Sequence, residues 1–134
     1  MAKGKVKKGK LLSTGHLDNL WSEAVKIYWG RCCALCLESK PVEAHHIIPR
    51  RHFVTRWMIE NGLPVCHGCH AKAHGYRMVD RIKTRIGLGR WEELCRLEGL
   101  TLKEYLAETG QTKAEFRKEK AKELRDIING NTHR

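Results

Sequence analysis

The chain has 134 residues, 41% of them hydrophobic, which is the usual size of a single domain with at most a small appendage. Its 26 Lys and Arg against 15 Asp and Glu give a formal charge of +11, so a polyanionic partner is favoured, nucleic acid ahead of an anionic membrane surface. No apolar run could span a bilayer, and the basic start lacks the apolar stretch of a secretory signal. We therefore expect a cytoplasmic protein with no membrane partner.

Residues 1–15 form a predicted basic arm. Five of the first ten residues are Lys, so charge repulsion should leave the arm disordered. The sequence leaves open whether the arm contacts phosphates or serves as a solvated tail or localisation signal. From Asp18 the apolar residues recur every three or four positions, which predicts a packing helix with Asp18 as its N-cap, Trp21 in the core and Gly30 at its end.

Two close pairs of cysteines follow this helix. In a reducing compartment such pairs favour a closed tetrahedral zinc site over a disulfide framework. Cys32 adjoins the first pair, but the two-residue gap is the standard spacing and favours Cys33. The predicted ligands of this structural Zn²⁺ are Cys33, Cys36, Cys66 and Cys69.

The segment between the two pairs contains most of the other polar candidates. Residues 41–48 read as a short strand that Pro49 ends, and Gly62 and Pro64 indicate a second strand. A helix is predicted from His67 to about Asp80. The basic loop after the first strand is well placed to contact phosphates. The predicted nucleic-acid-binding residues are Arg50, Arg51 and Arg56 in this loop and Lys72 in the helix.

The remainder of the chain, residues 87–134, is predicted to be a helical module. One helix covers residues 91–97, with Cys95 expected in the core, and capping boxes begin two more at Thr101 and Thr112. The turn at residues 108–110 is compatible both with a helix-turn-helix DNA reader and with an ordinary helical hairpin.

The order of histidines and asparagine resembles the HNH (ββα-metal) endonucleases. His45 and His46 stand at the first H of that motif, Asn61 at the N and His70 at the last H, and the pair His70 and His74 is similar to that of the colicin-type nucleases. The resemblance covers residues 31–80. It implies an α+β fold in which residues 16–86 form a ββα-metal HNH core with a zinc knuckle, flanked by an N-terminal helix and the C-terminal helical module.

The resemblance also implies roles for these side chains. His46 would be the general base, and Asn61 would hold the loop between the strands, although in some relatives an Asn at this site binds the metal. His70 and His74 lie one helical turn apart, so both could bind one divalent ion together with His45. Alternatively, His74 only caps or packs the helix. Neighbouring strand residues face opposite ways, so His45 and His46 serve one site only if the strand twists or ends there.

An all-imidazole ligand set favours Zn²⁺, Ni²⁺ or Mn²⁺ over Mg²⁺ for the catalytic metal, and no small-molecule cofactor is expected. The predicted function is a metal-dependent endonuclease that nicks or cuts double-stranded DNA, of phage or homing type. A homodimer or a larger phage assembly is compatible with this hypothesis. The alternative is a non-catalytic, zinc-dependent nucleic-acid-binding module, which explains the cysteines and the charge but not the order of the histidines.

Overall fold

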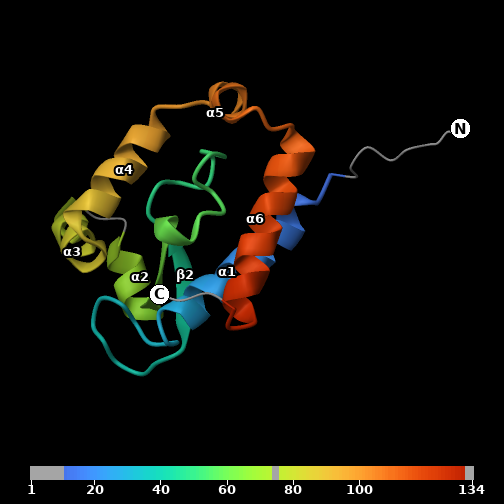
Figure 1. The fold of residues 1–134 in the computed structure, drawn as a ribbon. Helices are drawn as coiled ribbons and strands as arrows, with labels where there is room; N and C mark the ends of the chain where they lie inside the picture. Colours follow the sequence, from blue (N-terminus) through green and yellow to red (C-terminus); the bar gives the residue numbers. More distant parts are fainter. Residues whose placement is uncertain (1–10, 74–75, 132–134) are drawn as a thin grey trace, which may run out of the picture.

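The computed structural model of the chain describes residues 11–73 and 76–131. In this part of the chain the fold is mixed α+β, with six helices and a two-stranded antiparallel sheet (Figure 1). The elements in order are α1 (Thr14–Tyr28), β2 (Val42–His46), a short 3₁₀ turn (Ile59–Asn61), β3 (Gly62–Cys66), α2 (His67–Ala73), α3 (Tyr76–Ile86), α4 (Leu88–Glu98), α5 (Leu102–Thr109) and α6 (Lys113–Ile128). None of the described helices is both long and apolar enough to cross a membrane.

Helix α1 begins earlier than the apolar pattern predicted. Its N-cap is Ser13, whose side chain accepts a hydrogen bond from the backbone N–H of His16 at 3.1 Å, and not Asp18. The predicted arm reached residue 15, so its last two residues belong to this helix, and its residues 1–10 lie outside the described part of the chain. Asp18 lies one turn into the helix, where its side chain is available for tertiary contacts.

The two strands pair directly and lie against α1. In their register His45 is opposite Leu63, and His46 is opposite Gly62. A Cβ atom at position 62 would lie 2.6 Å from side-chain atoms of both Trp21 and Val25. The absence of a side chain at this position therefore allows α1 to approach the ribbon closely.

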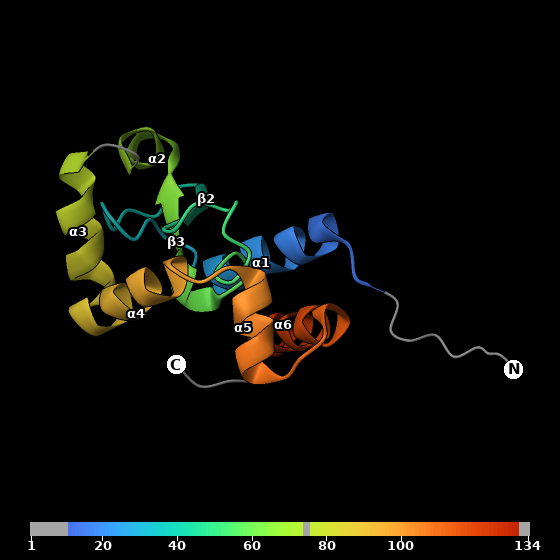
Figure 2. The same ribbon diagram turned by 90° about the horizontal axis from the view of Figure 1, so that it is seen from above.

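The chain buries two hydrophobic clusters. The first surrounds the cysteines and joins β3 to α3 through residues that include Leu63, Val65, Met78 and Ile82. The second joins α1 to α6, which lie side by side in both views (Figures 1 and 2). Phe116, Ala121 and Leu124 of α6 pack in this second cluster, so the last helix is joined to α1 through the core.

The helix boundaries after the sheet differ in part from the expectation. The long helix predicted from His67 is divided into α2 and α3, and residues 74–75 between them lie outside the described residues. Both predicted capping boxes are present, at Thr101 and Thr112. The prediction for Cys95 was wrong, because its side chain is exposed while Leu94 and Leu97 of the same helix face the interior.

Candidate functional site

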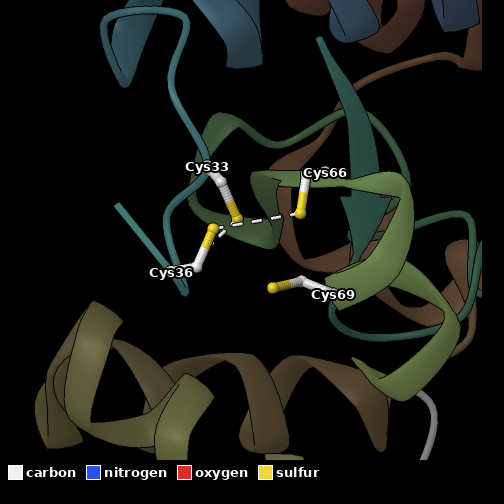
Figure 3. A group of neighbouring side chains, drawn as sticks. All are labelled: Cys33, Cys36, Cys66 and Cys69. Carbon is white, nitrogen blue, oxygen red and sulfur yellow. Dashed lines mark hydrogen bonds between the residues drawn. The ribbon is translucent and has the colours of Figure 1, made fainter. Parts of the chain in front are cut away.

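Four cysteine side chains meet at one point in the fold. Cys33 and Cys36 come from the loop after α1, Cys66 ends β3, and Cys69 lies in the first turn of α2 (Figure 3). Their sulfur atoms all lie within 4.8 Å of one another, with 3.9 Å between the sulfurs of Cys36 and Cys66. Four thiols at this spacing could hold a structural metal ion such as zinc.

Backbone and arginine contacts hold the loop that carries the first cysteine pair. The N–H of Ala34 donates to the carbonyl of Pro64 at 2.8 Å, which ties the loop to β3. Arg81 and Arg85 of α3 donate to the carbonyls of Leu35 and Ala34 at 2.7 and 2.9 Å. The thiol positions are therefore fixed by groups outside the cysteines themselves.

The thiol pKa values in the cluster are shifted in opposite directions. Burial opposes ionisation of Cys33, but the backbone N–H groups of Cys36, Cys66 and Leu35 outweigh it and lower the pKa of this thiol to about 6. Burial and the neighbouring sulfurs raise the pKa of Cys69 to about 12. The cluster thus holds one thiolate readily, whereas further ionisation of its thiols is opposed. A bound divalent ion would remove this opposition, because it lowers the pKa of the thiols that bind it.

Cys32 does not belong to this cluster. Its sulfur lies 3.9 Å from the carbonyl oxygen of Trp29. The assignment of Cys33 as the partner of Cys36 agrees with the cluster.

A second group of polar side chains lies on the face of β2 that is turned to α2. The rings of His45 and His70 are 5.2 Å apart between centroids, and His45 is only 5% exposed. Glu43, two residues before His45 on the same strand face, lies with its Oε1 2.5 Å from Nδ1 of His70. A carboxylate on Nδ1 favours the tautomer in which Nε2 is unprotonated, the form of histidine that binds metals.

His74, the third predicted metal ligand, lies outside the described residues, and so does the side chain of Lys72. Among the residues that the structure describes, the four cysteines form the one group of three or more possible metal ligands. The structure thus brings together two of the three predicted histidine ligands.

His46 lies on the opposite face of β2, against α1. Its ring stacks on Trp21, with centroids 3.8 Å apart and planes 8° from parallel. Its Nε2 is 3.0 Å from the carbonyl oxygen of Arg56. Because a carbonyl only accepts, Nε2 carries the hydrogen and Nδ1 is the basic nitrogen. Burial lowers the pKa of His46 to about 4, so the ring is neutral at pH 7.

Both strand histidines nevertheless border one cavity of about 600 Å³. The conflict expected between neighbouring strand residues is relieved because β2 ends at His46. His70 of α2 and Arg50 of the following loop line the same cavity. The rest of its lining is Ala44, Ile47, Pro49, Val79, Ile82 and Trp91.

Asn61 holds the loop between the strands. It is fully buried, and its Oδ1 accepts from the N–H of Ile48 at 2.7 Å. Its Nδ2 donates to the carbonyls of Ile48 and Thr55, both at 3.1 Å. These are the side chain to backbone contacts that the resemblance implies for this residue, and they fix the start and the middle of the loop that follows His46.

Arg56 has an internal role instead of the predicted contact with phosphate. Its guanidinium donates to both carboxylate oxygens of Asp18, at 3.0 and 2.8 Å, and to the carbonyl of Arg50 at 3.0 Å. Asp18 also accepts from the indole N–H of Trp57 at 2.8 Å. Arg50 and Arg51 are exposed, so these two remain available as the predicted phosphate contacts.

Sequence reasoning missed three residues that shape the site. Asp18 and Trp21 were assigned only to the packing helix, and Glu43 was not considered. The signal for Asp18 was its position, because it is a charged residue on the apolar side of the helix, three positions before Trp21. Strand alternation places Glu43 on the same face as His45, and that pattern could have indicated its contact with α2.

Comparisons of the chain with protein-family models, with curated proteins and with solved structures give no match.

Proposed function

We propose that the chain is a metal-dependent endonuclease of the HNH (ββα-metal) kind that hydrolyses phosphodiester bonds of DNA. The observation that carries the proposal is the convergence of His45, His46 and His70 on one cavity. His45 and His46 end β2, Asn61 lies in the turn before β3, and His70 lies in α2, which is the order that the resemblance requires. The net charge of +11 supports a polyanionic substrate.

His45 and His70 would hold the catalytic divalent ion, with His74 as a further proposed ligand. Their imidazoles suit Zn²⁺, Ni²⁺ or Mn²⁺ better than Mg²⁺. When bound, such an ion supplies charge stabilisation at the phosphoryl oxygens and at the departing 3′ oxygen. Glu43 would orient the ring of His70 and fix its tautomer, as carboxylates commonly do beside metal-binding histidines.

His46 is the proposed general base. The carbonyl of Arg56 fixes its tautomer, and the stacking on Trp21 fixes the plane of its ring. A neutral imidazole can accept the proton of a water at Nδ1 without placing an existing positive charge beside that water. Asn61 would support this geometry by holding the loop that carries the carbonyl of Arg56. The products would carry 5′-phosphate and 3′-hydroxyl ends, as the resemblance implies.

Arg50 and Arg51 would contact phosphates near the cleaved bond, because both are exposed and Arg50 lines the cavity. The four cysteines would hold a structural Zn²⁺ with no part in the reaction. The thiols would thus stabilise the fold, and the imidazoles would carry out the hydrolysis.

A non-catalytic, zinc-dependent nucleic-acid-binding module is the second candidate. The observation in its favour is that, within the described residues, the four cysteines form the one complete group of metal ligands. Such a module would bind nucleic acid in a salt-dependent manner and leave it intact.

Cleavage of supercoiled plasmid separates the two candidates. We expect the wild-type protein to nick or linearise the plasmid with at least one of Zn²⁺, Ni²⁺, Mn²⁺ and Mg²⁺, and EDTA to prevent the conversion. His46→Ala should lower the rate about 10²- to 10⁴-fold, the usual contribution of a general base, while leaving DNA binding nearly intact. His16→Ala is the matched control, because His16 is exposed on α1 and does not line the cavity. No conversion with any ion, together with a normal gel shift, would favour the binding module.

A further inference from the structure

The cavity beside the histidines has a second wall that the proposed hydrolysis does not use. Ile47 after β2, Val79 and Ile82 of α3, and Trp91 of α4 line this wall. Water activation and phosphate binding both need polar groups, and these four side chains offer almost none. This wall therefore contacts either an apolar part of a ligand or no ligand.

Trp91 is held in place from two sides. It packs against the hydrophobic cluster around the cysteines, and the ammonium of Lys83 lies 5.2 Å from the centroid of its ring. Its indole also borders the cavity, on a helix that lies outside the segment resembling the nucleases. A fixed aromatic ring at the border of a cavity loses little conformational freedom on binding.

The size and chemistry of the cavity match a nucleotide. Its volume of about 600 Å³ falls within the roughly 300–1,000 Å³ of sites that bind organic molecules. A phosphate group alone would leave most of this space empty. Imidazoles and the cationic Arg50 line one part and apolar side chains another, so the cavity can accept an anionic phosphate and a flat base together.

We propose that Trp91 stacks on a nucleobase next to the scissile phosphate, so that the site takes nucleic acid in which this base is unstacked. The position of the scissile phosphate rests on the proposed function. In a regular duplex each base is stacked on its neighbours, so it must leave the helix to reach a side chain in a pocket. The favoured substrate class is a single strand or a locally opened duplex.

Binding of short DNA tests this proposal without cleavage. The full-length protein, loaded with zinc and given no second metal, is titrated into fluorescent 12-nucleotide oligo(dT) and into a 12-base-pair duplex, and the dissociation constants are measured by anisotropy. Trp91→Leu keeps an apolar side chain without a ring and should weaken single-strand binding about 10- to 100-fold. Trp91→Phe keeps a ring and should restore most of the affinity, and neither variant should change duplex binding.

Two control variants frame the result. Leu88→Ala changes a residue of the same helix that is 62% exposed and does not line the cavity, so it should alter neither affinity. Arg50→Ala should weaken binding to the single strand and the duplex alike, because phosphates are common to both. In the wild type, single-stranded DNA should also quench an indole signal that is absent from Trp91→Phe, so the proposal is tested even if Trp91→Leu does not fold.

An equal loss of affinity for both DNA forms in Trp91→Leu would overturn the proposal, as would no loss or no quenching assigned to Trp91. In that case Trp91 only packs α4 against the core. The outcome is distinguishable from a failure of the proposed function. If the protein cuts no plasmid but Trp91→Leu loses affinity only for the single strand, the base site is supported and the nuclease is not. If the protein cuts plasmid but Trp91→Leu shows no such selective loss, the nuclease is supported and the base site is not.

Discussion

At the scale of single residues, Asp18 links helix α1 to the loop that positions the site. It joins α1 to the loop after β2 through Arg56 and Trp57, and the carbonyl of Arg56 in turn orients His46. Burial alone would raise the pKa of Asp18, but hydrogen bonds from Arg56 and Trp57 outweigh it and hold this pKa below its usual range. The ionised carboxylate therefore stabilises the fold.

Asp18→Asn should lower the free energy of unfolding by about 1.5–3 kcal/mol at pH 7, the usual range for hydrogen bonds to charged groups. The folded pKa of Asp18 lies below its unfolded value, so its contribution is fully present above the unfolded pKa and is lost as pH falls through the folded one. The difference between the two proteins should therefore shrink at acid pH. Urea unfolding of both proteins from pH 7 to pH 3 measures it.

Asp126→Asn is the control for this prediction. Asp126 pairs with Lys122, which is 74% exposed, whereas Arg56 is only 12% exposed. We expect almost no change in stability, as for most exposed ion pairs. If Asp18→Asn behaved like this control, or if its effect did not vary with pH, the carboxylate would not hold the loop.

Arg56 shows what residue patterns could and could not predict. Its place in a basic loop was evident, and the sequence favoured a contact with phosphate. Its partner Asp18 is 38 residues away, on a helix whose angle to the loop is fixed only by packing. Local patterns therefore predicted that the loop is basic, but not which of its arginines point outward.

At the scale of elements, the approach of α1 to the strand ribbon positions His46 on Trp21. Gly62→Ala tests this approach, since the added methyl group would lie 2.6 Å from side-chain atoms of Trp21 and Val25. We expect a loss of about 1–3 kcal/mol in the free energy of unfolding, typical of overpacking a core. Thermal or urea unfolding measures the loss.

Gly68→Ala is the matched control, because nothing lies within 4 Å of the added atom and residue 68 lies inside α2. Here Ala should leave stability unchanged or raise it by about 0.5–1 kcal/mol through its better helix propensity. A Gly62→Ala protein as stable as Gly68→Ala would mean that α1 does not lie against β3 as described.

The last two helices give less support to a helix-turn-helix reader than the turn between them suggested. One side of α6 is buried against α1, and its exposed side carries Glu119 and Glu123 among its lysines. Acidic side chains on an outward face oppose contact with phosphates. The turn predicted at residues 108–110 is present, and Gly110 adopts the left-handed conformation that ends α5.

At the scale of the whole molecule, the four cysteines lie where the loop after α1 meets the junction of β3 and α2. Cys66→Ser should remove a ligand from the proposed zinc site and abolish the cooperative unfolding transition, because metal binding and folding are coupled in such sites. Circular dichroism during heating, with the zinc content of each protein measured alongside, checks this. Cys95→Ser is the control, since Cys95 is exposed and should bind no metal. A thermal unfolding transition in Cys66→Ser that matches the wild type would contradict the structural zinc site.

Sequence patterns predicted the parts of this molecule that depend on short spacings. The cysteine pairs, the two strands and the capping boxes each involve residues a few positions apart, and all are present. The packing of α6 on α1 joins segments about a hundred residues apart, and no local pattern encodes which faces meet. The same holds for Trp91, which borders the cavity only because α4 folds back beside α3.

The histidines, and not the cysteines, are the proposed reacting centre. The most direct test is plasmid cleavage by protein dialysed to one zinc per chain, before and after addition of a second divalent ion. We predict no cleavage with one zinc, full cleavage after addition of the second ion, and no restoration in His45→Ala at the same zinc content. Full cleavage by the one-zinc protein, or equal restoration in His45→Ala, would contradict the account.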